Sequence, residues 1–232
     1  MIDKSARIMM LDTETANDLD YPLVYDIGFE VFDLNGNTFA SESFINVDIF
    51  CDKDFMTTAY YAEKVPMYQA DIRNGTRKLA EWKKIKRKLH DIVDAYDVRI
   101  ICAHNAAFDS RALNTTQRFI TSSKYRYFLP HGMEWWDTLK MSRSVLKNDV
   151  DYRLFCIHNH YVTKNNQNRY TAEVIYKYLT GNNDFSESHT GLEDVQIERK
   201  IFEYCLDRMP DIDGRLWPPK LEKIAIDVDY WE

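Results

Sequence analysis

The order of apolar and polar residues along the chain predicts alternating strands and helices. Strand-like segments cover residues 6–11, 26–33, 39–47 and 98–103, and helix-like segments cover 79–96, 110–122, 171–179 and 189–208. The second and third strands are separated by the turn residues Asn35-Gly36-Asn37, which favour a hairpin. In the helix-like segments the apolar residues recur at spacings of three and four, as one buried face requires. This alternation predicts an α/β or α+β domain.

Composition and charge narrow the class of protein. With 232 residues, 45% of them hydrophobic, the chain can bury a full core, and we expect one domain over residues 1–208 with an extension over 209–232. The net charge of -7 argues against general coating of polyanions but permits a local site. No apolar run approaches the ~20 residues of a membrane helix, and the first residues do not resemble a secretory signal. We expect a cytoplasmic protein without a membrane partner.

Two carboxylates follow the first apolar strand. Asp12 and Glu14 stand two positions apart, so in an extended backbone they project from the same face. Such a pair repels itself unless protons, cationic side chains or metal ions neutralise it, and Mg²⁺ and Mn²⁺ prefer oxygen ligands. The pattern therefore permits half of a metal site, and a solvated strand end is the alternative.

Further candidates stand at two other element boundaries. Asp109 follows the strand at 98–103, and an Asp there could instead cap the next helix. His189 stands at the start of the last helix with Asp194 in its first turns, which suits a general base and a fourth metal ligand. A surface or capping histidine is the alternative. Because ligands gather at strand ends in open α/β sheets, the repeated placement favours one common site.

These three segments together resemble the motifs of the DEDDh 3′–5′ exonucleases. The segments are Leu11-Asp12-Thr13-Glu14-Thr15, then His104-Asn105-Ala106-Ala107-Phe108-Asp109, then His189 followed by Asp194 with four residues between. The resemblance covers about residues 6 to 207. The proteins that share the fold of this family include the proofreading subunit of bacterial replicative DNA polymerase and ribonuclease T. Three positions depart from the usual pattern, namely Ala16, Gly191 and Val195, and they concern packing and substrate approach more than ligand chemistry.

The resemblance implies a fold and a reaction. The fold would be RNase H-like, with a central mixed five-stranded sheet flanked by helices. Asp12, Glu14, Asp109 and Asp194 would hold two Mg²⁺ or Mn²⁺ ions, with Asp12 bridging them, and His189 would take a proton from the attacking water. Two such ions can activate water and stabilise both oxygens of the scissile linkage. They would also let an acidic protein attract phosphate.

Candidate substrate contacts are less sharply defined. Thr13 and Thr15 could bond the terminal nucleotide, and His104 and Asn105 belong to the same predicted contact set. Phe108 could stack on a base or be a core residue. The stretch from Arg73 to His90 contains eight Lys or Arg residues and only one acid, Glu81. That stretch could guide a nucleic acid, or it could be the solvated exterior of a helix.

The predicted function is metal-dependent removal of nucleotides from a free 3′ end, with single-stranded DNA favoured. A 3′–5′ exoribonuclease acting on short RNA is the first alternative, because the predicted site recognises phosphate and a free end before the sugar. An inert nucleic-acid-binding or polymerase-accessory module is the second. A polymerase or other replication protein remains an open partner, although no glutamine-led apolar tail of the kind that docks on sliding clamps is present.

Overall fold

The computed structural model describes residues 2–122 and 126–217, and a mixed sheet lies at its centre. Its strands are β1 (Ile8–Ala16), β2 (Leu23–Phe32), β3 (Thr38–Asn46), β4 (Lys78–Ala80), β5 (Ile100–Ala103) and β6 (Glu134–Asp137). They lie in the order β4-β3-β2-β1-β5-β6. Strands β1, β2 and β3 pair antiparallel, whereas β5 pairs parallel with both β1 and β6, and β4 pairs parallel with β3.

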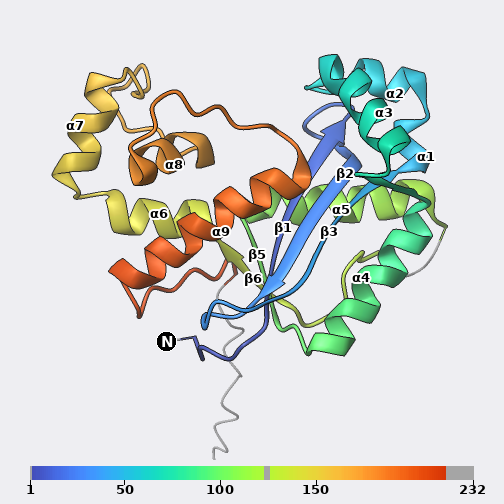
Figure 1. Cartoon of the computed structure of the whole chain (residues 1–232), viewed down its shortest axis with the longest axis horizontal. Helices are drawn as coiled ribbons and strands as arrows, with labels where there is room; N and C mark the ends of the chain where they lie inside the picture. Colours follow the sequence, from blue (N-terminus) through green and yellow to red (C-terminus); the bar gives the residue numbers. More distant parts are fainter. Residues whose placement is uncertain (1, 123–125, 218–232) are drawn as a thin grey trace, which may run out of the picture.

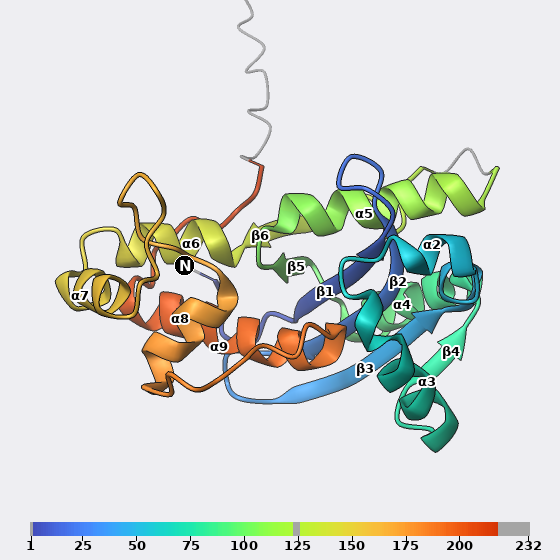
Figure 2. The ribbon, with the colours of Figure 1, turned by 90° about the horizontal axis from the view of Figure 1, so that it is seen from above.

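Helices cover both faces of the sheet. They are α1 (Val47–Phe50), α2 (Lys53–Thr57), η1 (Ala62–Lys64), α3 (Val65–Asn74), α4 (Trp82–Tyr96), α5 (Ala106–Ile120), α6 (Thr138–Leu146), α7 (Val150–His158), α8 (Ala172–Thr180) and α9 (Gly191–Arg208). Helices α6 to α9 lie on one side of β1 and β2, and α4 and α5 lie on the other (Figures 1 and 2). The molecule is therefore a three-layered α/β domain.

Strand β1 separates the two halves of the core. Met9 and Leu11 pack with side chains of α4 and α5, whereas Ile8 and Met10 pack with side chains of α6 to α9. Because side chains alternate along a strand, every even-numbered position of this part of β1 faces α9. The same alternation continues into the two acidic residues at positions 12 and 14.

The predicted fold class is confirmed, with two adjustments. The described sheet has six strands rather than five, because the three-residue edge strand β4 is too short to show a period and was predicted as the start of the following helix. Strand β1 extends to Ala16 and α5 begins at Ala106, so Asp12, Glu14 and Asp109 lie inside regular elements and not in the loops beside them.

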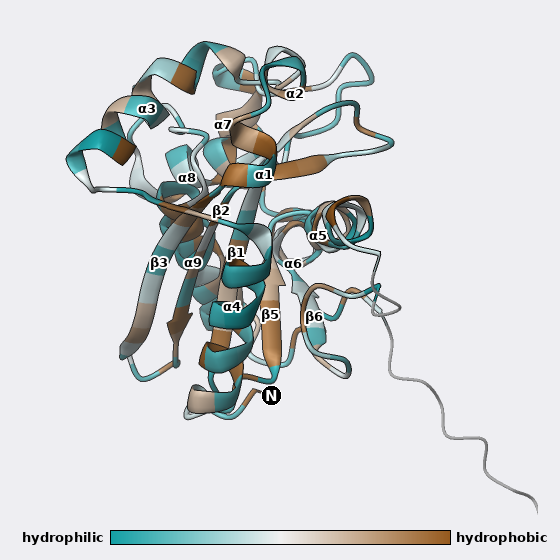
Figure 3. Ribbon diagram, turned by 90° about the vertical axis from the view of Figure 1, so that its right-hand side faces the viewer, coloured by the Kyte–Doolittle hydropathy of each residue, from teal (hydrophilic) through white to brown (hydrophobic). Residues whose placement is uncertain are grey.

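Most of the basic residues between Arg73 and His90 lie on the outside of the molecule. Along α4, apolar residues face the core while its outward face is hydrophilic (Figure 3). Lys78 and Lys88 both pair with Glu42, at 2.5 and 3.2 Å. Arg77 is buried among three carboxylates instead. This arrangement is that of a helix exterior.

The start of the predicted C-terminal extension lies along β6. The Asp137 amide donates to the Gly214 carbonyl at 2.8 Å, and the Leu216 amide donates to the Trp135 carbonyl at 2.7 Å. The rest of the predicted extension, residues 218–232, lies outside the described residues. Within the described chain, none of the helices is both long and apolar enough to span a bilayer.

Candidate active site

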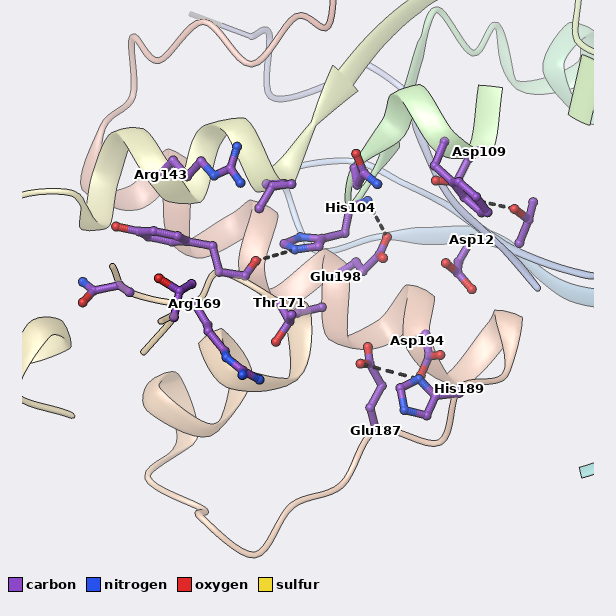
Figure 4. A pocket seen from close by; sticks show the side chains of 18 of the residues that line it. Asp12, His104, Asp109, Arg143, Arg169, Thr171, Glu187, His189, Asp194 and Glu198 are labelled. Carbon is purple, nitrogen blue, oxygen red and sulfur yellow. Dashed lines mark hydrogen bonds and ion pairs between the residues drawn. The ribbon is translucent and has the colours of Figure 1, made fainter. Parts of the chain in front are cut away.

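A cavity of about 1180 Å³ opens where β1, α5 and α9 meet (Figure 4). The acidic and imidazole side chains that line it are Asp12, Glu14, His104, Asp109, Glu187, His189, Asp194 and Glu198. All five residues predicted to be catalytic are thus brought to one cavity, although together they span more than 170 positions of the sequence. Of the predicted substrate contacts, Thr13, His104, Asn105 and Phe108 also line it, and Thr15 does not.

Strand β1 presents its two acids to α9. Asp12 and Glu14 continue the face of Ile8 and Met10, which packs against that helix. Thr13 projects to the opposite face, where its hydroxyl donates to Asp109 Oδ1 at 2.8 Å. Thr13 therefore orients a carboxylate of α5, a role that the sequence-based prediction of a substrate contact did not include.

Two glycines bring the start of α9 onto the sheet. A Cβ atom at Gly28 of β2 would lie 2.1 Å from the carbonyl carbon of Gly191, far inside van der Waals contact. The Gly191 amide also donates to Asp26 Oδ2 at 3.1 Å. Only a residue without a side chain permits this approach, which explains the departure at position 191. The contact holds His189 and Asp194 beside β1.

The cavity also contains an acid that the sequence reasoning missed. Glu198 is 3% exposed, and its Oε2 accepts from the His104 amide at 3.1 Å. It lies one turn beyond Asp194 on α9, so both carboxylates share a helix face. That spacing was the available signal, but an acid four positions from another acid is also common on solvated helices.

Burial and mutual repulsion favour the protonated form of these acids. The pKa of Asp12 is raised well above its ordinary value, first by burial and then by Glu198, Asp109, Glu14 and Asp194. Burial is likewise the main cause that raises the pKa of Glu14 to about 9 and those of Asp109 and Asp194 to about 7. The pKa of Glu198 is also raised well above its ordinary value, mainly by burial.

This donor set fits divalent cations. Asp12 is partly exposed as a residue, yet its Oδ2 atom is buried and has no hydrogen-bond partner among the described residues. One potential ligand atom from each of Glu14, His189 and Asp194 lies within 4.8 Å of the others. An unpartnered carboxylate oxygen amid like charges is what a bound cation would satisfy, and hard oxygen donors suit Mg²⁺ and Mn²⁺.

His189 lies at the rim of the cavity, and its backbone conformation and its contacts fix the orientation of the ring. Its backbone adopts a left-handed conformation, with φ at 49°, and its ring stacks on Tyr61 with centroids 4.2 Å apart. Its Nδ1 atom lies 3.8 Å from Glu187 Oε2. Burial, and then the charge of Lys64, lowers its pKa below the ordinary value of 6.5. The imidazole is therefore largely neutral at neutral pH, as a general base must be.

The other predicted contact residues have mixed roles. Both ring nitrogens of His104 are used within the protein, by Thr138 Oγ1 at 2.9 Å and the Tyr170 carbonyl at 2.8 Å. Asn105 directly precedes α5 in a left-handed conformation, and its backbone amide donates to Asp137 Oδ1 at 3.0 Å. Phe108 packs against the core and also lines the cavity, so its core role is observed and its stacking on a base stays a prediction.

Solved structures share the fold at low sequence identity. Exonuclease I from Methylocaldum szegediense matches with a TM-score of 0.54 and 15% identity, over 89% of this chain and 41% of that one. A 3′-exonuclease studied for 3′-end recognition of the histone mRNA stem-loop matches at 0.55 and 9%, over 88% and 66%. A zinc-bound complex of Escherichia coli exonuclease I with single-stranded DNA matches at 0.52 and 15%, over 89% and 41%.

The chain therefore has an RNase H-like fold, which it shares with the matched exonucleases. The chain spans between 41% and 66% of the length of these three structures, so it corresponds to one part of each. No protein-family profile matches the chain, and neither does any curated protein sequence. The likeness is thus one of fold.

Proposed function

We propose that the protein is a metal-dependent 3′–5′ exonuclease that releases nucleotides from a single-stranded end. The observation that carries this proposal is the buried Oδ2 of Asp12, which has no hydrogen-bond partner among the described residues and is repelled by four further carboxylates. A purely structural site would not gather five acids whose charges oppose one another. Their arrangement at the end of β1 and the fold of the matched exonucleases both support a hydrolytic role.

In this proposal the carboxylates and His189 have separate roles in hydrolysis. When bound by Asp12, Glu14, Asp109 and Asp194, two divalent cations would lower the pKa of water and offset charge on the phosphate. Because Nδ1 of His189 faces Glu187, Nε2 remains to accept the proton from the attacking water. Water adds to phosphorus and the bond to the 3′ oxygen breaks, which gives a nucleoside 5′-monophosphate and a shortened strand with a free 3′-hydroxyl.

DNA is the favoured polymer, and RNA is the second candidate. The matched structures include one with single-stranded DNA and one concerned with a histone mRNA stem-loop, so the fold serves both polymers elsewhere. The test is incubation of the purified protein with DNA and RNA oligonucleotides bearing free or blocked 3′ ends, in Mn²⁺ or EDTA. We expect shortening only of free ends in Mn²⁺. No shortening of either polymer would reject the enzyme and leave a binding module.

A further inference from the structure

The cavity has an acidic half, lined by the carboxylates, and a basic half, lined by cationic side chains. Besides the acids, its lining contains four cationic side chains: Arg143, Lys147, Arg153 and Arg169. The acids come from β1, α5, α9 and the residues just before α9. The cations come from α6 and the residue that follows it, from α7, and from the loop that leads to α8. Figure 4 shows Arg143 and Arg169 on the far side of His104 from Asp12 and Asp109.

None of these four cations has an acidic partner among the described residues, and Arg153 contacts asparagine side chains instead. Among the described residues, no carboxylate lies within 4.0 Å of Arg143, Lys147 or Arg169 to form an ion pair. All three are exposed to the cavity and solvent. They lie beside the acidic cluster, in a chain that carries 37 acids against 30 Lys and Arg. This group can receive a mobile anion.

Arg153 fixes the loop of the basic half that carries Arg169. Its guanidinium donates to the side-chain oxygens of Asn168 and Asn166, at 2.7 and 2.8 Å, and so fastens the loop that carries Arg169 to α7. A backbone bridge between Val162 and Asn168 closes the same loop. His104 joins the two halves, because its ring bonds to the Tyr170 carbonyl while its amide bonds to Glu198. The basic half is therefore fixed relative to the carboxylates.

We infer that Arg143, Lys147 and Arg169 bind backbone phosphates of the strand on the 5′ side of the scissile linkage. This inference rests on the proposed function. A strand whose last phosphate lies among the carboxylates continues only in the 5′ direction, and its next phosphates need cations rather than more acids. The site reads phosphate, so it serves DNA and RNA alike. It gives the enzyme a preference for oligonucleotides over single nucleotides.

The test compares a triple variant with a matched control. Arg143→Gln/Lys147→Gln/Arg169→Gln removes the three cations, and Arg73→Gln/Lys83→Gln/Arg87→Gln removes three exposed cations that do not line the cavity. Each is assayed on a single-stranded DNA oligonucleotide, on the matching RNA, and on thymidine 5′-monophosphate p-nitrophenyl ester, which has no upstream phosphate. The first variant should lose about tenfold or more in kcat/KM on the oligonucleotides, mainly through KM. Hydrolysis of the ester and the control variant should both be unchanged.

Oligonucleotide binding provides a readout that needs no turnover. In fluorescence anisotropy at increasing KCl, the slope of log affinity against log salt should fall by about 0.7 for each phosphate that the variant no longer binds, up to about 2 in the triple variant. Equal losses on oligonucleotide and ester, or an unchanged slope, would overturn the inference. Absence of hydrolysis by the wild-type protein on every substrate would reject the proposed function, and the binding slope would still decide whether the basic half holds phosphate.

Discussion

At the residue scale, Asp12 occupies the most unfavourable position of the site. Its carboxylate is surrounded by four others, and one of its oxygens has no partner among the described residues. Above the ordinary Asp value of 3.8, the metal-free protein must therefore take up a proton at this residue as it folds. Asparagine keeps the shape and removes that requirement.

Asp12→Asn should abolish hydrolysis and stabilise the metal-free protein. The expected gain is on the order of 1 kcal/mol at neutral pH and should vanish as the pH falls towards the ordinary value of an Asp. Urea unfolding in EDTA at neutral and acidic pH measures it. Asp91→Asn, on the exposed face of α4, is the control and should change neither property. Retained hydrolysis would remove Asp12 from the mechanism.

His189 lends itself to a pH measurement. Because burial lowers its pKa below 6.5, kcat/KM should rise with pH through a value below 6.5 and level off above it. His189→Gln should lower kcat by roughly 10²- to 10⁴-fold and abolish that rise. If His189 were instead chiefly a metal ligand with Glu14 and Asp194, the variant would mainly weaken Mn²⁺ binding, which calorimetric titration would show.

At the element scale, the contact between β2 and α9 sets the geometry of the site. Gly28→Ala would place a methyl group 2.1 Å from the Gly191 carbonyl carbon, so α9 must move away from β1. We expect a loss of about 1 to 3 kcal/mol in the free energy of unfolding and a large loss of activity. Gly36→Asn is the control, because nothing lies near that glycine and Asn tolerates its positive φ. Urea unfolding that ranks Gly36→Asn as the more damaging change would contradict this account.

Elements with a clear period were predictable from the sequence, and others were not. Strand β1 and helices α4 and α9 follow from apolar spacing, and the acids at their ends followed with them. Residues 47–74 have no single period, so the helices that place Tyr61 against His189, and Lys64 against Tyr61 and Ser188, were not predicted. Arg77 illustrates the same difficulty, because only the tertiary structure separates this buried arginine from the exposed cations around it.

At the scale of the whole molecule, one cavity contains a region of negative charge and a region of positive charge. The net charge of -7 would repel a nucleic acid at long range, whereas under the proposed function bound cations and the basic half would reverse the local potential. Under that proposal, specificity for a strand end would depend on metal occupancy as well as on shape. Binding and stability should respond to the same ions.

Stability against pH should consequently depend on metal. Without metal, Asp109 and Asp194 keep protons up to about pH 7 and Glu14 up to about pH 9, whereas an unfolded chain releases them near 3.8 and 4.5. The folded state then binds more protons than the unfolded state, so stability must fall as the pH rises from about 4 to about 9. Bound Mn²⁺ replaces those protons and should remove most of this fall. Thermal unfolding in EDTA and in Mn²⁺ between about pH 5 and about pH 9 measures both curves. Stabilisation by Mn²⁺ should widen with pH, and parallel curves would mean that the carboxylates do not hold the ion.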